Sequence, residues 1–284
     1  MENVNGGRLR APAWAATFLP MDLAFRELGG TGSPVVILHG LFGSSQNWAG
    51  FGRRLAHLGR VLAVDLRNHG DSAHARPHSL AACVDDLREW SGLHAPPPLR
   101  LIGHSMGGLV AMGFALRHPG LTAGVASVDI APRPYPPDHG AELRALRTSL
   151  AGAGTRAELD ALLAPFIPEE RQRQFLLTNA VRDGAGFRWR IDPEILAGST
   201  ISEDFAGLHG RYEGEALLVA CGRSTYVTAG DLPIMRGFFP AARQVTLAAA
   251  DHWPHVSDPA GLTAALEGFL ARCNNPAERS SDTV

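Results

Sequence analysis

The stretch Leu99–Gly108, LRLIGHSMGG, joins an apolar run to a glycine-rich turn and then to an apolar segment that continues over 106–118. The apolar run predicts a buried strand, and the spacing of the later apolar residues predicts a helix. Between them, the G-x-S-x-G pattern indicates a tight turn with Ser105 at its tip. Gly103 and Gly107 flank this serine and allow neighbouring backbone to approach closely. The stretch therefore predicts a serine held in a strained turn between a strand and a helix.

Apolar runs alternate with helical patterns on both sides of this turn, and the alternation predicts the fold class. Strands are predicted at 34–40, 60–66, 99–103, 123–130, 215–222 and 243–249, and helices at 79–92, 106–118, 231–239 and 258–272. Strands that are apolar on both faces and alternate with helices are typical of a parallel sheet covered on both sides. We therefore expect an α/β fold with a mostly parallel central sheet.

The middle of the chain departs from this alternation. No strand is predicted between Pro132 and Tyr212, and helical patterns follow a proline cluster there. These patterns lie at 141–151, 156–164 and 169–178. The expected divisions of the chain are an N-terminal leader (1–21), a core in two parts (22–132 and 213–273), a helical insertion (133–212) and a flexible tail (274–284).

Composition excludes several classes of function. Apolar residues make up 45% and charged residues 19% of the 284 residues, with a net charge of −2, so neither bulk disorder nor a basic surface for nucleic acid or anionic membrane is expected. All 26 basic residues are arginines, which excludes a Schiff-base lysine, a P-loop and a serine–lysine pair. Cys83, Cys221 and Cys273 show no C-x-x-C spacing and indicate a reducing compartment. Without a signal peptide or transmembrane run, a cytoplasmic location is expected.

The candidate general base is a histidine late in the chain, because the order in this arrangement is serine, acid, histidine. His252 and His255 lie between the last predicted strand and the last helix. His252, the first after the strand, is the expected base, and His255 is the alternative. A metal pair is another interpretation of the H-x-x-H spacing, although Pro254 lies between the two and no third ligand is nearby.

The candidate acid is Asp129, at the end of the strand that follows the Ser105 helix. The loop 222–226 contains no carboxylate, and Asp231 comes later, at the start of a helix. A carboxylate at position 129 can hold the tautomer of His252 and stabilise its imidazolium form. A turn or capping role is the alternative interpretation of this aspartate.

A second loop, HGLFG at 39–43, follows the first predicted strand. Such a loop supplies one backbone donor to an oxyanion hole, and the residue after the serine supplies the other. The expected donors are therefore the amides of Leu41 and Met106. His39 is interpreted as a structural residue at the strand end.

Several motifs together resemble one family, the α/β-hydrolases, and more narrowly a branch of small esterases found in bacteria and, as abhydrolase-domain proteins, in mitochondria. The motifs are HGLFGS (39–44), DLRNHGDS (65–72), GHSMGG (103–108), SVDIAP (127–132), FRWR (187–190) and HWPH (252–255). The resemblance implies that the acid lies in the V-D-I-A-P segment, which supports Asp129, and that 133–212 is a helical cap over the active site. One departure is Asp251, where the branch has glycine before the histidine. This carboxylate either perturbs the base or points to solvent.

The expected function is that of a serine hydrolase with a Ser105–His252–Asp129 triad. It would cleave carboxylic esters, or thioesters, of short to medium acyl chain through an acyl-enzyme, with substrate contacts from Phe42 and Trp189. No cofactor, metal, nucleic acid or membrane partner is expected, only a small-molecule substrate. The alternatives are a C–C bond hydrolase or a cofactor-free perhydrolase on the same triad, and a non-catalytic small-molecule receptor on the same scaffold.

Overall fold

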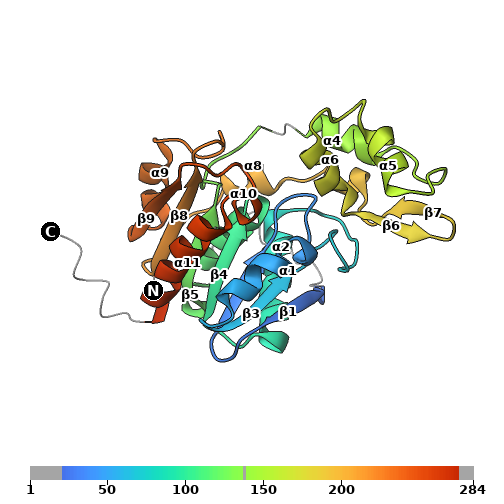
Figure 1. The fold of residues 1–284 in the computed structure, drawn as a ribbon. Coiled ribbons are helices and arrows are strands. Elements are labelled where there is room, and N and C mark those ends of the chain that lie inside the picture. Colours follow the sequence, from blue (N-terminus) through green and yellow to red (C-terminus); the bar gives the residue numbers. More distant parts are fainter. Residues whose placement is uncertain (1–20, 137–138, 275–284) are drawn as a thin grey trace, which may run out of the picture.

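A seven-stranded sheet forms the centre of the computed structural model, which describes residues 21–136 and 139–274 (Figure 1). Its strands are β1 (Phe25–Gly29), β2 (Pro34–Leu38), β3 (Arg60–Val64), β4 (Leu99–His104), β5 (Thr122–Val128), β8 (Glu215–Cys221) and β9 (Ala242–Leu247). Their order is β1-β3-β2-β4-β5-β8-β9, and only the edge strand β1 runs antiparallel to its neighbour. The predicted α/β fold with a mostly parallel sheet is confirmed. The expected leader and tail lie outside the described residues, apart from Met21 and Asn274.

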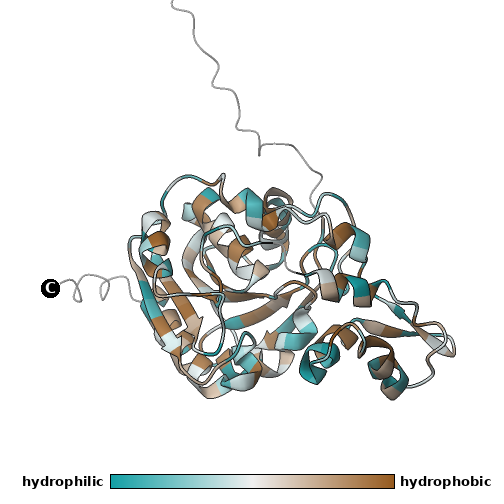
Figure 2. Cartoon of the chain, turned by 90° about the horizontal axis from the view of Figure 1, so that it is seen from above, coloured by the Kyte–Doolittle hydropathy of each residue, from teal (hydrophilic) through white to brown (hydrophobic). Residues whose placement is uncertain are grey.

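Helices cover both faces of the sheet. They are α1 (Ser45–Gly52), α2 (Leu80–His94), α3 (Met106–Arg117), α9 (Asp231–Phe238), α10 (Pro254–Ser257) and α11 (Pro259–Asn274). Apolar residues of α1 and α11 form one buried cluster against the sheet, and those of α2, α3 and α9 form another on its other face. Figure 2 shows the strands between these layers coloured mainly as hydrophobic. Burial on both faces explains why the strands are continuous apolar runs.

The parallel register brings the carboxyl ends of the central strands to one edge of the sheet. β4 pairs with β5 up to His104 and Val128, and β5 pairs with β8 up to Val128 and Val219. The chain segments that follow β2, β4 and β5 therefore emerge side by side. Open α/β sheets form their ligand sites at this edge.

The segment between β5 and β8 lies mostly in a lobe at one side of the sheet, and its last helix lies against the core (Figure 1). It contains α4 (Gly140–Leu146), α5 (Arg156–Leu163), α6 (Glu170–Leu177), β6 (Ala180–Asp183), β7 (Gly186–Trp189), α7 (Pro193–Leu196) and α8 (Ile201–Phe205). Its helices α4 to α7 share one buried cluster, which Phe42 of the core also joins, whereas Ile201 and Phe205 of α8 pack into the main core. The three predicted helices are present, the first of them shorter than expected.

The prediction that this segment contains no strand is wrong. β6 and β7 pair as an antiparallel hairpin, with Ala180 opposite Trp189 and Asp183 opposite Gly186. The turn between them has Gly184 at a φ of 59°, a conformation that glycine adopts without steric cost. The register makes Gly184-Ala185 the two-residue turn, and glycine at its first position suits a hairpin. The flanking strands, AVRD and GFRW, are only four residues long, too short for an alternating pattern to stand out.

Candidate active site

Ser105 occupies the turn between β4 and α3 with a φ of 50° and a ψ of −122°, a conformation that non-glycine residues rarely adopt. A Cβ on Gly103 would overlap the carbonyl of Gly107, and a Cβ on Gly107 would overlap the carbonyl of Leu38. Both glycines are therefore required for the close contacts of this turn. The amide of Ser105 donates to the carbonyl of Val128 at 3.0 Å, which fixes the turn to the neighbouring strand.

The structure brings Asp129 and His252 together. Nδ1 of His252 donates to Oδ2 of Asp129 at 2.8 Å, and the carboxylate is fully buried. The other carboxylate oxygen accepts from the amide of Cys221 at 3.1 Å, so two bonds from different elements hold it. Asp129 has a φ of 54°, which bends the chain sharply after β5. The geometry matches the arrangement in which a buried carboxylate fixes the tautomer of a catalytic imidazole.

The other carboxylates and the other histidine considered for the acid and the base have different partners. Asp231 pairs with Arg133 at 2.8 Å and accepts from backbone at the start of α9. Asp251 neither perturbs the base by contact nor points free into solvent, because its Oδ2 pairs with Arg171 of α6 at 2.5 Å. His255 is half-buried and stacks on the indole of Trp48, with ring centroids 4.3 Å apart. Within the described ranges, no group of three or more His, Cys, Asp or Glu side chains is placed to bind a metal.

His104, the variable residue inside the G-x-S-x-G pattern, supports the His252 loop. Its Nε2 donates to the carbonyl of His252 at 2.7 Å, and burial lowers the pKa of His104 well below its usual range. The imidazole is therefore neutral with its proton on Nε2, because the carbonyl can only accept. This bond connects the turn of Ser105 directly to the backbone of the expected base.

The two residues expected to supply the oxyanion donors lie beside the same pocket. Leu41 and Met106 both line the pocket that contains Ser105. Among the described residues, neither amide has a hydrogen-bond acceptor, as suits donors that await a developing negative charge. The adjacent Phe42 is held at both its polar groups: its amide donates to Nε2 of His69 at 3.2 Å, and its carbonyl accepts from the side chain of Asn179 at 2.7 Å.

Ser105 lies where two hollows meet. The first, of about 220 Å³, is called here the apolar lobe and is lined chiefly by Met106, Leu109, Ile130, Leu143, Leu196 and Ile201. The second, of about 190 Å³, is called the histidine lobe and is lined by His252, Trp253, Phe175, Glu142 and Gln172. Leu41, Phe42, Ser105, His139 and Tyr226 line both. A pocket with a serine at the junction of two lobes suits a substrate with two parts joined at one bond.

Comparison with known proteins decides the family. The family described as the alpha/beta hydrolase family matches residues 35–266. The chain belongs to this family. It is 35% identical to the sn-1-specific diacylglycerol lipase ABHD11 of Mus musculus, over 90% of this chain and 87% of that protein. It is 30% identical to Esterase YbfF of Escherichia coli strain K12, over 84% of this chain and 93% of that protein.

A solved structure described as a marine microorganism esterase is also similar to this α/β-hydrolase. It superposes with a TM-score of 0.82 at 33% identity and covers 88% of this chain and 99% of that one. The predicted membership of the α/β-hydrolases and the predicted hydrolase class are confirmed. Among the described residues, the structure contains no helix with the length and apolar character needed to cross a membrane.

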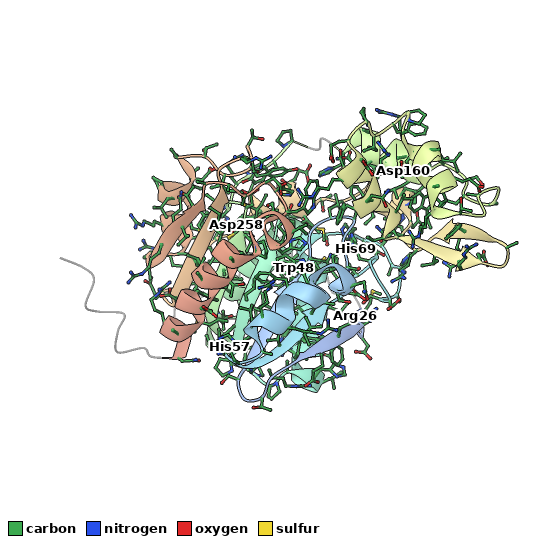
Figure 3. All side chains as sticks on the ribbon, in the orientation of Figure 1. Arg26, Trp48, His57, His69, Asp160 and Asp258 are labelled. Atoms are coloured by element: carbon green, nitrogen blue, oxygen red, sulfur yellow. The ribbon has the colours of Figure 1, made fainter. Side chains whose placement is uncertain are left out.

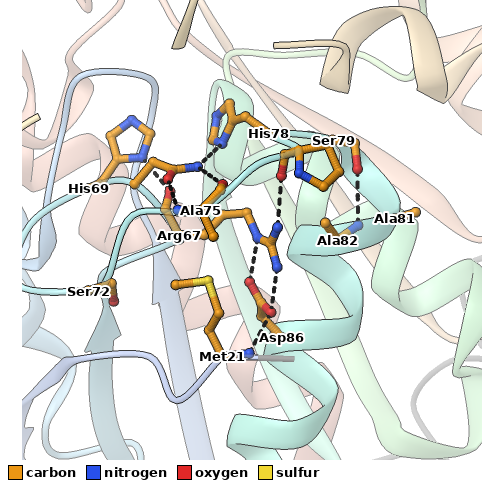
Figure 4. Close-up of polar contacts among 12 residues, drawn as sticks. Met21, Arg67, His69, Ser72, Ala75, His78, Ser79, Ala81, Ala82 and Asp86 are labelled. Atoms are coloured by element: carbon orange, nitrogen blue, oxygen red, sulfur yellow. Dashed lines mark hydrogen bonds and ion pairs between the residues drawn. The ribbon is translucent and has the colours of Figure 1, made fainter. Parts of the chain in front are cut away.

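In this α/β-hydrolase, the D-L-R-N-H-G-D-S motif has a structural task (Figure 4). Arg67 and Asp86 form a fully buried two-bond ion pair, at 2.6 and 2.8 Å. Asp65 accepts from the amide of Ser45 at 2.5 Å and ties the motif to the start of α1. Removing one partner of such a buried pair leaves an uncompensated charge, which typically costs 3–5 kcal/mol. The motif therefore stabilises the loop that supports Phe42 rather than entering the pocket.

Two buried histidines in this region have fixed neutral tautomers. His39 donates from Nδ1 to the carbonyl of Gly40 and accepts at Nε2 from the amide of Leu66. His69 accepts at Nε2 from the amide of Phe42. A proton added at either Nε2 would face an N–H donor. Burial accordingly lowers the pKa of His39 to about 4 and that of His69 to about 3.

We expect these two histidines to lower the free energy of unfolding as the pH falls below 6.5. Above pH 6.5 both are neutral in the folded and the unfolded chain. Below it, only the unfolded chain takes up the protons, so the free energy of unfolding falls by about 1.4 kcal/mol per pH unit for each histidine, down to about pH 4. The urea midpoint at pH 5 should therefore be well below that at pH 7, and equal midpoints would contradict the expectation. His57→Gln, at an exposed histidine (Figure 3), should leave the slope unchanged.

Two of the residues near the pocket differ from the sequence-based expectation. Trp189 lines neither the apolar lobe nor the histidine lobe of the pocket. It donates its Nε1–H to the carbonyl of Thr148 at 2.9 Å, so it packs within the inserted segment between β5 and β8. Tyr226 was not predicted at all. Its ring stacks on the imidazole of His252, with centroids 4.0 Å apart and planes 17° apart. The only signal in the sequence is an aromatic residue in the loop after β8, where the carboxylate is missing.

Proposed function

We propose that the chain hydrolyses carboxylic esters through an acyl-enzyme on Ser105. The observation that carries the proposal is the 2.8 Å hydrogen bond between His252 and buried Asp129. This bond leaves Nε2 as the acceptor nitrogen of an imidazole that lines the same lobe as Ser105. The two relatives are named as a lipase and an esterase, which supports ester substrates.

The proposed reaction has two halves. Nε2 of His252 takes the proton of Ser105 while Oγ attacks the ester carbonyl carbon, and the amides of Leu41 and Met106 stabilise the oxyanion. His252 then gives this proton to the leaving oxygen as the ester C–O bond breaks, which leaves the acyl group on Ser105. In the second half, water attacks the acyl-enzyme, His252 takes the water proton, and the same proton returns to Oγ as the acid departs. A thioester follows the same path with sulfur as the leaving atom.

The position of the proton donor indicates which part of the substrate each lobe holds. A general acid must lie within hydrogen-bond reach of the group that it protonates. His252 lines the histidine lobe and not the apolar lobe, so the leaving group is proposed to lie in the histidine lobe. The acyl chain then occupies the apolar lobe. In this proposal residues 133–212 act as a cap, supported by lining residues from α4, α6, α7 and α8.

The apolar lobe is proposed to suit acyl chains of short to medium length. We expect kcat/KM across p-nitrophenyl esters from acetyl to palmitoyl to be highest between butyryl and octanoyl. Leu143→Ala shortens a side chain that lines this lobe, so it should move the maximum to longer chains. Leu162→Ala removes an exposed side chain that lines neither lobe and should leave the maximum unchanged. A wild-type maximum at palmitoyl would contradict the proposed chain length.

Tyr226 is proposed to position the imidazole of His252 through ring stacking. Aromatic pairs contribute about 0.5–1.5 kcal/mol beyond the area they bury, so we expect Tyr226→Ala to lower the acylation rate by about three- to tenfold. Tyr226→Phe retains the ring and should restore a rate near that of the wild type. Stopped-flow acylation by p-nitrophenyl butyrate measures this step. Equal rates for the alanine and phenylalanine variants would show that stacking does not position the base.

A further inference from the structure

The charges that line the pocket have one sign. Two carboxylates line it, Glu142 in the histidine lobe and Glu203 in the apolar lobe, and among the described lining residues there is no arginine. Because every basic residue other than histidine in this chain is an arginine, no permanently charged cation of the described residues lines either lobe. Glu203 is exposed to solvent, whereas Glu142 is half-buried. Glu142 therefore acts on a bound substrate with less screening than Glu203.

The carboxylate of Glu142 is held in place over the histidine lobe. Its Oε1 accepts from the side-chain amide of Gln172 at 2.6 Å, a bond that joins α4 to α6. The two arginines nearest in the chain to Gln172 are paired elsewhere, Arg171 with Asp251 at 2.5 Å and Arg173 with Asp160 at 2.9 Å. Neither arginine lines the pocket. The carboxylate of Glu142 thus keeps its negative charge while it accepts from a neutral amide, and no arginine lines the histidine lobe among the described residues.

We propose that Glu142 selects the leaving group: the histidine lobe takes esters of uncharged, hydroxyl-bearing alcohols and rejects those whose alcohol carries a phosphate close to the ester. This inference rests on the proposed function and on the lobe assignment, because the leaving group must share the lobe with His252. A free hydroxyl on the alcohol can donate to the carboxylate, and such charge-assisted bonds are stronger than neutral ones. An anionic group in the same lobe meets repulsion and has no cation to pair with.

A matched pair of substrates tests the proposal directly. Monobutyrylglycerol and its 3-phosphate differ only in a phosphate near the ester. For the wild type we expect kcat/KM to be at least about tenfold higher for the uncharged glyceride at low ionic strength, and the ratio to fall as salt is added. In Glu142→Gln, the ratio should fall by about fivefold or more. Glu170→Gln removes an exposed carboxylate of α6 that lines neither lobe, and it should keep the wild-type ratio.

The outcomes separate this proposal from the proposed function. Equal kcat/KM for the two substrates in the wild type, or an unchanged ratio in Glu142→Gln with the wild-type fold, would overturn the role of Glu142 and leave ester hydrolysis intact. If neither substrate is hydrolysed, a p-nitrophenyl ester distinguishes the cases. Turnover of that ester shows that glycerol esters are the wrong leaving-group class, which also overturns the proposal. No turnover of any ester removes the proposed function itself.

Discussion

Replacing Ser105 with alanine is expected to abolish ester turnover, with a loss of about 10⁶ in kcat. The reason is that Ser105 shares the histidine lobe with His252, whereas Ser199 and Ser202 line only the apolar lobe. Loss of the nucleophile from a triad of this kind has an effect of this size. The side chain makes no hydrogen bond that holds the fold among the described residues, so the variant should unfold at nearly the wild-type temperature. Hydrolysis of p-nitrophenyl butyrate and thermal unfolding followed by circular dichroism measure the two effects.

The matched control for this variant is Ser149→Ala. Ser149 is exposed, follows α4 and lines neither lobe, so its replacement should leave kcat within about twofold of the wild type. Wild-type turnover in a sequence-verified Ser105→Ala protein would refute the assignment of the nucleophile. Loss of turnover together with loss of the fold would instead assign Ser105 a structural role.

Replacing Asp129 with asparagine is expected to lower kcat by about 10⁴. The amide group can occupy the same space, but its NH₂ would favour the wrong tautomer of His252 and could not stabilise the imidazolium. KM should change little, because Asp129 is fully buried beneath the imidazole and lines neither lobe. Steady-state kinetics on p-nitrophenyl butyrate, with kcat and KM resolved separately, measures the effect.

Two other aspartates provide the comparison. Asp231→Asn and Asp251→Asn change carboxylates that pair with Arg133 and Arg171, so each should cost far less than Asp129→Asn. If kcat falls further in Asp231→Asn or Asp251→Asn than in Asp129→Asn, that aspartate and not Asp129 is the acid of the triad. A wild-type kcat in Asp129→Asn would show that the buried carboxylate is a turn residue, the alternative that its sequence position allows.

The central strands could be predicted from sequence because a strand that is buried on both faces is a continuous apolar run, which stands out along the chain. Runs such as PVVILHG at 34–40 are too apolar for any other position in a chain of this composition. The edge strand β1 escaped prediction for the opposite reason. It pairs on one side only, and most of its residues, FRELG at 25–29, are partly exposed. Its sequence carries too few apolar residues for a strand pattern to stand out.

Some residues of the candidate site could likewise be predicted from sequence, and others could not. Ser105, Asp129 and His252 each follow a strand, and parallel strands deliver their carboxyl ends to one edge, so local patterns suffice to bring them together. Tyr226 and the pairing of Asp251 with Arg171 depend on how separate loops and an inserted helix meet. No local periodicity encodes such contacts. The same holds for Glu142 and Gln172, which lie on different helices and are 30 residues apart along the chain.

The most direct test of the central claim is the intact mass of the wild-type protein after brief exposure to a small fluorophosphonate, followed by peptide mapping. This reagent reacts with a serine only when a working base activates it. We expect a single adduct on Ser105, and a much slower reaction in Asp129→Asn. No adduct on the folded wild-type protein, or an adduct on a serine other than Ser105, would contradict the proposal that Ser105 is an activated nucleophile.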